Sequence, residues 1–152
     1  MNPFAVLGLA PRLQLDAKEL ERRYLQLSRE RHPDLQRGGD LQMAELNAAY
    51  RTLRDRWTRA RALIEIHDQH LMDATKNLDA GFLTAALELA EAVAEATPAT
   101  APALVARLRA AVEAQWERIS QALACADHRA AATHLHEARY YQKALADLEE
   151  SA

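Results

Sequence analysis

The tripeptide His32-Pro33-Asp34 is the part of the sequence whose residue types could act chemically on a partner. It places an imidazole and a carboxylate on either side of a proline. Proline lacks a backbone N–H and pushes the residue before it out of the α region, so the motif is expected in a loop. There His32 could donate a hydrogen bond and Asp34 could pair with a partner's arginine. His32 and Asp34 could instead only cap neighbouring helix ends, so the surrounding elements decide between the two interpretations.

A helix is predicted immediately before this loop. Asp16 lies three residues before Glu19, which is the spacing of a capping box. Apolar residues then recur at helical spacing at Leu20, Tyr24 and Leu27. The rest of the helix surface carries the arginines Arg22, Arg23 and Arg29. Their charge would steer an acidic partner toward the loop.

A second helix is predicted after the loop, with Asp40 as its candidate N-cap. Its apolar stripe consists of Met43, Leu46, Ala49 or Tyr50, and Leu53. The periodicity continues weakly to Ile64, with a bend expected near Asp55. A shorter helix near the N-terminus, which Asn2 can cap and Gly8 can end, completes this half of the chain.

The second half of the chain contains three amphipathic segments, at about 78–96, 101–125 and 127–150, after a polar stretch at 67–79. Short connections between helices force neighbours to pack together, which predicts a three-helix bundle. Candidate core residues are Trp116, Ile119, Leu123, Leu135, Leu145 and Leu148. Abundant alanine and only 5% aromatic residues favour helices over strands, and 49% hydrophobic residues suffice for real cores. The predicted fold class is all-α.

Charge divides the chain at the same polar stretch. Residues 1–66 contain 12 Lys and Arg against 9 Asp and Glu, whereas residues 67–152 contain 7 against 13. The basic half is too mixed in sign to serve as a nucleic-acid surface. Nowhere do 18 apolar residues follow one another, and the N-terminus lacks the pattern of a signal peptide. A cytoplasmic protein that does not bind membranes is expected.

The His32-Pro33-Asp34 loop between two helices resembles the J-domain of DnaJ-type co-chaperones. More of the chain is similar to the HscB family, the co-chaperones of bacterial iron-sulfur cluster assembly. The segments that carry this similarity are FAVLGLAPRLQLD at 4–16, LNAAYRTLRDRWTRARALI at 46–64 and GFLTAALELAE at 81–91. The resemblance implies a J-domain, made of a helical hairpin plus short helices, joined at an angle to a three-helix bundle. The implied bounds are 1–68 for the J-domain, 69–77 for a linker or elbow, and 78–152 for the bundle.

The resemblance also implies two partners for a cytoplasmic bacterial protein. The first is a DnaK-type, HscA-like chaperone, whose ATPase the J-domain stimulates. The residues implied to bind it are His32, Pro33, Asp34, Arg22, Arg23 and Arg29. The second is the iron-sulfur cluster scaffold protein, which the bundle delivers to the chaperone for cluster transfer and maturation of iron-sulfur proteins. Its implied contacts are Leu83, Leu87 and Tyr140, with Glu88 and Glu91 beside them. The protein is expected to need no cofactor or metal and to catalyse no reaction itself.

The apolar pattern around 82–94 favours a binding role independently of the resemblance. One stripe contains Phe82, Leu89 and Val93, and another, about 100° away around the helix, contains Leu83 and Leu87. One stripe is enough to face the bundle core. The other is a candidate exposed patch, of the kind that marks a protein-binding surface, flanked by Glu88 and Glu91. Burial of both stripes within the bundle is the alternative.

Several positions depart from the family pattern. Arg31 stands where J-domains usually have an aromatic residue, and Leu35 replaces the usual lysine after the motif. The pair Arg56-Trp57 stands where proline is common. Ala85 and Ala86 replace larger polar residues on the helix expected to face the scaffold. The departures therefore fall on both expected partner surfaces.

Two other functions are open. A J-domain protein that serves a different client would bury Leu83, Leu87 and Tyr140. A helical-bundle enzyme or metal sensor would use histidines, but no HExxH or closed four-ligand pattern occurs around them. The candidate groups are His67, Asp68, His70 and Asp73, and His128, His134 and His136. Cys125, the single cysteine, is expected to be a small buried apolar residue.

Overall fold

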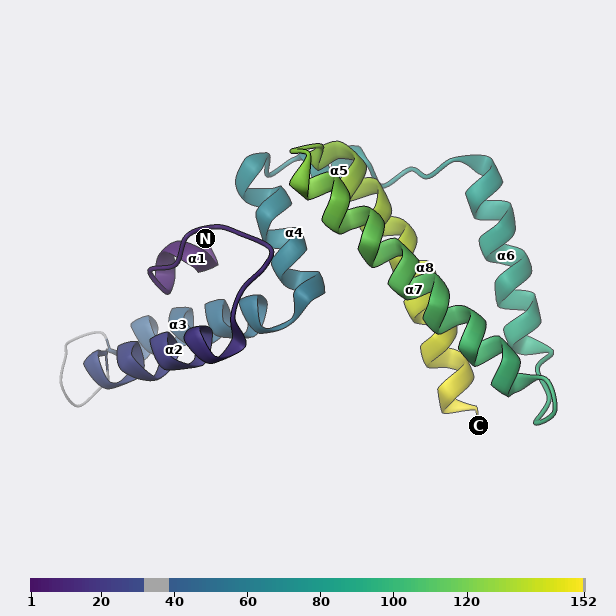
Figure 1. The fold of residues 1–152 in the computed structure, drawn as a ribbon, viewed down its shortest axis with the longest axis horizontal. Coiled ribbons are helices and arrows are strands. Elements are labelled where there is room, and N and C mark those ends of the chain that lie inside the picture. The colour runs from purple at the N-terminus through teal and green to yellow at the C-terminus, as the bar shows by residue number, and fades with distance from the viewer. Residues whose placement is uncertain (32–38, 152) are drawn as a thin grey trace. The chain divides into compact units, whose positions relative to one another are not determined.

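A computed structural model describes residues 1–31 and 39–151 of the chain. Within these ranges all regular elements are helices, which confirms the all-α prediction (Figure 1). The chain divides into two compact units, Met1–Gln69 and His70–Ala152. The motif His32-Pro33-Asp34, and Leu35 after it, lie outside the described residues.

The first unit contains α1 (Pro3–Val6), α2 (Ala17–Glu30), α3 (Gly39–Arg54) and α4 (Arg56–His67). The expected caps start the first two helices. The Oδ1 atom of Asn2 accepts a hydrogen bond from the Phe4 N–H at 3.0 Å, and that of Asp16 accepts from the Lys18 N–H at 2.9 Å. The expected cap of α3 is wrong, because the helix begins at Gly39 and Asp40 is its second residue.

The core of the first unit forms where α1, α2 and α4 pack on α3. Its buried residues are Phe4, Leu7, Leu20, Leu27, Leu46, Ala49, Leu53 and Ala62. The predicted apolar stripes of α2 and α3 thus meet. At their contact the Tyr24 and Tyr50 rings stack with centroids 4.2 Å apart, and the Tyr24 hydroxyl donates to Asn47 Oδ1 at 2.6 Å. The hairpin of α2 and α3 therefore has both an apolar and a polar link across it.

The bend predicted near Asp55 is present. Asp55 separates α3 from α4 and caps α4, since its Oδ1 accepts from the Trp57 N–H at 3.0 Å. Arg59 then fixes the corner by donating from Nε to the Leu13 carbonyl at 2.8 Å and from its terminal nitrogen to the Leu53 carbonyl at 2.6 Å. Burial lowers the pKa of the Arg59 guanidinium, and the Asp55 carboxylate acts in the opposite direction. One arginine thereby joins three segments of the first unit.

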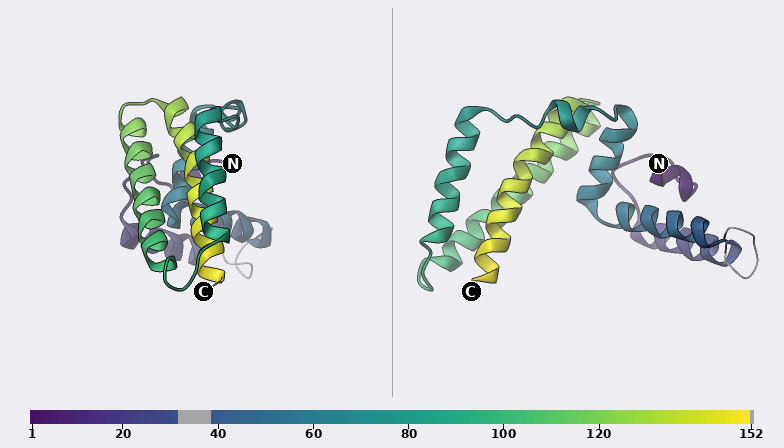
Figure 2. Two further views of the ribbon diagram at one scale, coloured as in Figure 1. Left: turned by 90° about the vertical axis from the view of Figure 1, so that its right-hand side faces the viewer. Right: turned by 180° about the vertical axis from the view of Figure 1, so that it is seen from behind.

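The second unit contains α5 (Leu71–Ala74), α6 (Ala80–Ala94), α7 (Ala101–Ala124) and α8 (His128–Glu150). The predicted three long helices are present, and α8 packs on both α6 and α7. Toward its N-terminal end α6 diverges from α8 (Figures 1 and 2). Of the predicted core residues, Trp116, Ile119, Leu135 and Leu148 are buried, whereas Leu123 and Leu145 are partly buried.

The segment predicted as a linker, 69–77, contains α5, and from residue 70 onward it belongs to the second unit. Leu71 and Met72 are buried, and α5 packs on α8. His136 on α8 donates from Nε2 to the Met72 carbonyl oxygen at 2.7 Å. Two apolar side chains and this hydrogen bond attach the segment to the bundle. The polar composition of the segment did not indicate this attachment.

The joint between α7 and α8 has an unusual residue for its geometry. The Asp127 N–H donates to the Ala122 carbonyl at 2.8 Å and the Ala126 N–H to the Leu123 carbonyl at 3.1 Å, which is the Schellman pattern. Its left-handed position is held by Ala126, with φ of 58°, where glycine is usual.

Among the described helices none is long and apolar enough to cross a membrane.

Candidate functional site

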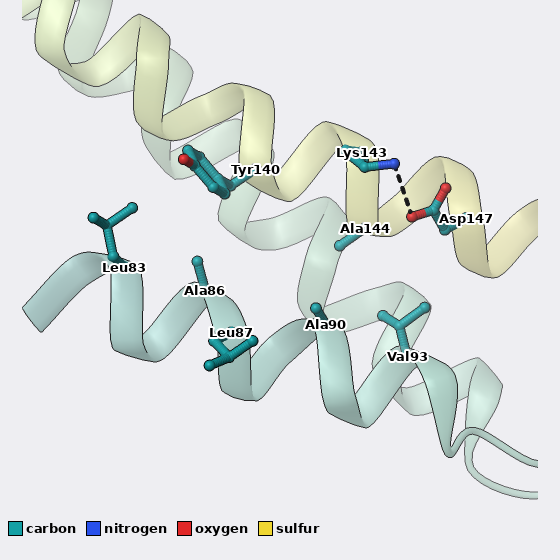
Figure 3. Close-up of a pocket in the computed structure, with 9 residues that line it drawn as sticks. All are labelled: Leu83, Ala86, Leu87, Ala90, Val93, Tyr140, Lys143, Ala144 and Asp147. Carbon is teal, nitrogen blue, oxygen red and sulfur yellow. Dashed lines mark hydrogen bonds and ion pairs between the residues drawn. The ribbon is translucent and has the colours of Figure 1, made fainter. Parts of the chain in front are cut away.

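An apolar groove lies between α6 and α8, with a volume of about 360 Å³ (Figure 3). Leu83 and Leu87 stand on the α6 side, and Tyr140 faces them from α8. These three side chains are 41%, 62% and 45% exposed. The lining is completed by Ala86, Ala90 and Val93 of α6 and by Lys143, Ala144 and Asp147 of α8. The groove, as defined by these residues, is an open apolar surface.

Local structure explains why α6 leaves this surface open. Asp79 caps the helix by accepting from the Phe82 N–H at 2.7 Å, which fixes its first turn. The Phe82 ring then reaches α8 and contacts the rings of Tyr140 and Tyr141 edge-on. Its centroid lies 5.6 Å from that of Tyr140 and 5.9 Å from that of Tyr141. Further along, Leu89 is buried against α8. The stripe of Phe82, Leu89 and Val93 faces the bundle, so Leu83 and Leu87 turn to the side.

The structure brings together Leu83, Leu87 and Tyr140, the three apolar residues that the resemblance implies as scaffold contacts. Glu88 and Glu91 are exposed on α6 but lie outside the groove lining. Ala86 forms part of the groove floor, so the small side chain opens space that a larger residue would fill. Sequence reasoning missed the contribution of α8 beyond Tyr140. The helical spacing of Leu83 and Leu87 also places Ala90 on the same face of α6. Nothing in the sequence pattern of α8 indicates which of its faces meets α6.

The chemistry of the groove suits binding of an apolar segment. The ion pair between Lys143 and Asp147, 3.4 Å apart, sits at its edge, where both side chains are exposed. Only Lys143 and Asp147 carry formal charge among the lining residues. No described lining side chain is a cysteine, serine or histidine, so the groove offers no nucleophile or general base of those types.

The second predicted surface is the arginine-bearing face of α2. Arg22 and Arg29 are exposed, as expected of residues that meet a partner. Arg31, the unusual residue before the motif, is the C-cap of α2 and is partly buried. The helix thus ends at Glu30, two residues before His32, and the exposed arginines lie on the helix that precedes the motif.

Arg23, grouped with them in the prediction, has an internal role. Its Nε donates to the Leu7 carbonyl oxygen at 2.9 Å and its terminal nitrogen to Gln26 Oε1 at 3.1 Å. Gly8, with φ of 65°, allows this approach, because a Cβ atom there would lie 2.7 Å from a guanidinium nitrogen of Arg23. Arg23 therefore ties α2 to the turn after α1.

The remaining candidates do not form a metal centre in the described part of the chain, where no group of three or more His, Cys, Asp or Glu side chains could hold an ion. His134 pairs with Glu137 at 2.7 Å, and His136 bonds the Met72 carbonyl. The expectation that Cys125 is buried is wrong, because it follows the last turn of α7 and its side chain is exposed.

The helical hairpin of α2 and α3 in one unit, with a helical bundle in the next, is the arrangement of the class of J-domain co-chaperones with a C-terminal helical domain. Residues 78–149 match the family model described as the HSCB C-terminal oligomerisation domain. The structure of chaperone HscB from Vibrio cholerae is 25% identical, with a TM-score of 0.81, and the match covers 99% of this chain and 97% of that one. Human co-chaperone protein HscB is 22% identical, with a TM-score of 0.83 and coverage of 99% and 82%. These matches support the identification of the chain as an HscB family member.

Proposed function

We propose that this protein is a two-ended adaptor with no catalytic activity of its own. Its J-domain stimulates the ATPase of a DnaK-type, HscA-like chaperone, and its bundle delivers the iron-sulfur cluster scaffold protein to that chaperone. The observation that carries the proposal is the joint exposure of Leu83, Leu87 and Tyr140 on one groove. Membership of the HscB family supports both partners.

The groove has the properties of a client-binding surface. An exposed apolar side chain gains about 1.5 to 3 kcal/mol when a partner buries it fully, so two leucines and a tyrosine can supply much of a moderate affinity. Their places are fixed by the Asp79 cap and by the Phe82 ring, so little order has to be imposed on binding. A rigid apolar groove of this kind favours a partner segment that presents its own apolar residues.

The J-domain end supplies charge. Arg22 and Arg29 are exposed on α2, and the sequence reaches His32 directly after the C-cap residue Arg31. Long-range attraction between these cations and an acidic chaperone surface would raise the association rate and orient the encounter. Within that encounter His32 and Asp34 are the proposed trigger residues. Arg23 contributes chiefly by holding α2 in place.

The mechanism is proximity. A scaffold protein held by the bundle and a chaperone held by the J-domain become parts of one complex. Capture of the scaffold by the chaperone then takes place at a high effective concentration. The chain's own residues bind and position, and ATP hydrolysis takes place on the chaperone.

The test is steady-state ATP turnover by the cognate chaperone, measured with and without scaffold protein. His32→Gln is expected to abolish stimulation while leaving scaffold affinity and helical content unchanged. Leu83→Ala/Leu87→Ala is expected to keep J-domain stimulation but to lose the additional effect of scaffold. Leu41→Ala is the matched control for scaffold binding, because Leu41 is 70% exposed and lies outside the bundle.

Two outcomes would contradict the proposal in different ways. If the His32→Gln variant stimulates the chaperone ATPase as strongly as wild type, the proposed J-domain role is wrong. Unchanged scaffold affinity in Leu83→Ala/Leu87→Ala would leave a J-domain co-chaperone that serves another client.

A further inference from the structure

A second cavity adjoins the apolar groove on α8. Its volume is about 410 Å³, and it is lined by Lys76, His136, Arg139, Tyr140, Gln142 and Lys143. Tyr140 and Lys143 line both cavities, so the groove and this cavity form one continuous surface. We call the second cavity the cationic pocket, because three of its lining residues carry positive charge and none is acidic.

The cations of this pocket are available to a ligand. Lys76 pairs with Asp73 at 3.0 Å and Lys143 with Asp147 at 3.4 Å, and in both pairs at least half of each side chain is exposed. Exposed pairs of this kind contribute little free energy, so an incoming anion can compete for the lysines. Among the residues that the structure describes, none forms a hydrogen bond or ion pair with the Arg139 guanidinium. Arg139 is therefore the cation best placed to accept a new partner.

The fold assembles this pocket from segments distant in sequence. Lys76 follows α5, whereas Arg139 and Lys143 are on α8, more than sixty residues later. The hydrogen bond from His136 Nε2 to the Met72 carbonyl and the buried side chains of α5 hold the two segments together. Thr75, next to Lys76, is itself buried, and its hydroxyl donates to the Leu71 carbonyl at 2.8 Å. The backbone that carries Lys76 is thus anchored against α8.

The opposite side of the groove has the opposite charge. Glu91 follows Leu87 by four residues and Glu88 follows it by one, and both are exposed. Since α6 turns about 100° per residue, these carboxylates lie beyond Leu87 on the side of α6 away from its buried stripe. A partner that extends past the groove on the α6 side would approach these carboxylates, whereas on the α8 side it would approach the cations of the cationic pocket.

We propose that the cationic pocket binds a carboxylate of the partner segment whose apolar residues occupy the groove. The occupant is a segment of the scaffold protein with at least one Asp or Glu adjacent to its apolar contact residues. The inference rests on the proposed scaffold-binding function of the groove and adds the residues that set its specificity. Arg139 receives the carboxylate by hydrogen bonding, and Lys76 and Lys143 add attraction.

Charge complementarity, rather than apolar area, then selects the occupant. Apolar contacts with Leu83, Leu87 and Tyr140 would accept many apolar segments with similar affinity. A carboxylate aimed at Arg139 distinguishes one class of segment and one direction of binding. The contribution of the pocket should weaken as salt screens it, whereas the apolar contribution should persist.

The experiment measures the affinity of the full chain for the cognate iron-sulfur scaffold protein by calorimetry at low and at high salt. Arg139→Glu is expected to weaken binding by about tenfold or more at low salt and less at high salt. Arg139→Gln should show a smaller loss in the same direction. Arg118→Glu is the matched control, since Arg118 is exposed on α7, lies outside both cavities and changes the net charge equally.

Leu83→Ala/Leu87→Ala separates failure of this inference from failure of the proposed function. If that variant loses affinity while Arg139→Glu and Arg118→Glu both bind like wild type, the groove binds the scaffold and the cationic pocket is overturned. If the leucine variant binds like wild type, or wild type does not bind, the scaffold function itself fails and the inference fails with it. Loss in Arg139→Glu, with normal helical content and no loss in Arg118→Glu, supports the pocket.

Discussion

The two units differ in how completely neighbouring helices cover the apolar face of a helix. In the first unit α3 is covered by α1, α2 and α4, and Leu46 and Leu53 are fully buried. In the second unit α6 packs chiefly on α8 and buries Leu89, while Leu87 is 62% exposed. Both units have enough apolar residues for their cores. The difference therefore comes from the number of helical neighbours, and it leaves the first unit with a closed core and the second with an open apolar groove.

The prediction with the largest expected effect on stability compares a leucine-to-alanine substitution in each unit. Leu53→Ala is expected to lower the free energy of unfolding by about 2 to 5 kcal/mol, because it leaves a cavity in a closed core. Leu87→Ala is expected to change it by at most about 0.5 kcal/mol, since the side chain is mainly in solvent. Urea unfolding followed by circular dichroism measures both. Similar losses in the two variants would show that Leu87 is part of a core.

A second prediction concerns the corner of the first unit. Arg59→Leu removes the donors to the carbonyls of Leu13 and Leu53 and should cost about 1.5 to 3 kcal/mol, because hydrogen bonds from a charged donor are lost. Arg61→Leu is the control, since Arg61 only pairs with exposed Glu65 at 2.8 Å. It should cost less than about 1 kcal/mol. Equal losses in thermal denaturation would argue against the corner contact.

A substitution in the turn after α1 is expected to have a smaller effect on stability. Gly8→Ala should destabilise the first unit by about 1 to 2 kcal/mol, because alanine is strained at a φ of 65° and its Cβ would crowd the Arg23 guanidinium. Ala5→Gly provides a check that the turn rather than small-residue content is responsible. Amide hydrogen exchange should show faster opening of α2 in Gly8→Ala, and unaltered exchange there would contradict the link.

The smallest prediction is a gain of stability in the second unit. Ala126→Gly should stabilise the bundle by about 0.5 to 1 kcal/mol, because glycine accepts the left-handed conformation at the end of α7 without steric cost. Ala124→Gly, placed inside the helix, is the matched opposite and should destabilise it. A rise in Tm for the first and a fall for the second would be the expected pair of results.

Local patterns predicted the helices well because their signals are contained in short windows. Asn2 and Asp16 cap helices as expected, and Asp55 marks the bend. The helix α5 escaped prediction because a single turn is too short to show periodicity. Its burial depends on the tertiary contact with His136, which no window of sequence contains.

The same difference between local sequence signals and tertiary contacts applies to the candidate sites. Leu83 and Leu87 follow from the spacing within α6, whereas their placement opposite Tyr140 required the resemblance to the HscB family. The role of Arg23 was missed because its partner, the Leu7 carbonyl, is sixteen residues away. Lys76 and Arg139 were missed for the same reason, since only the packing of α5 on α8 brings them together.

The exposed thiol of Cys125 has a practical consequence. It is the only sulfhydryl in the chain, and the apolar groove is lined by α6 and α8, not by α7, whose C-cap carries this cysteine. A maleimide fluorophore should therefore attach at a single position in the unmutated protein, outside the groove lining. Anisotropy of that fluorophore would follow the addition of scaffold and chaperone, separately and in either order, within one sample.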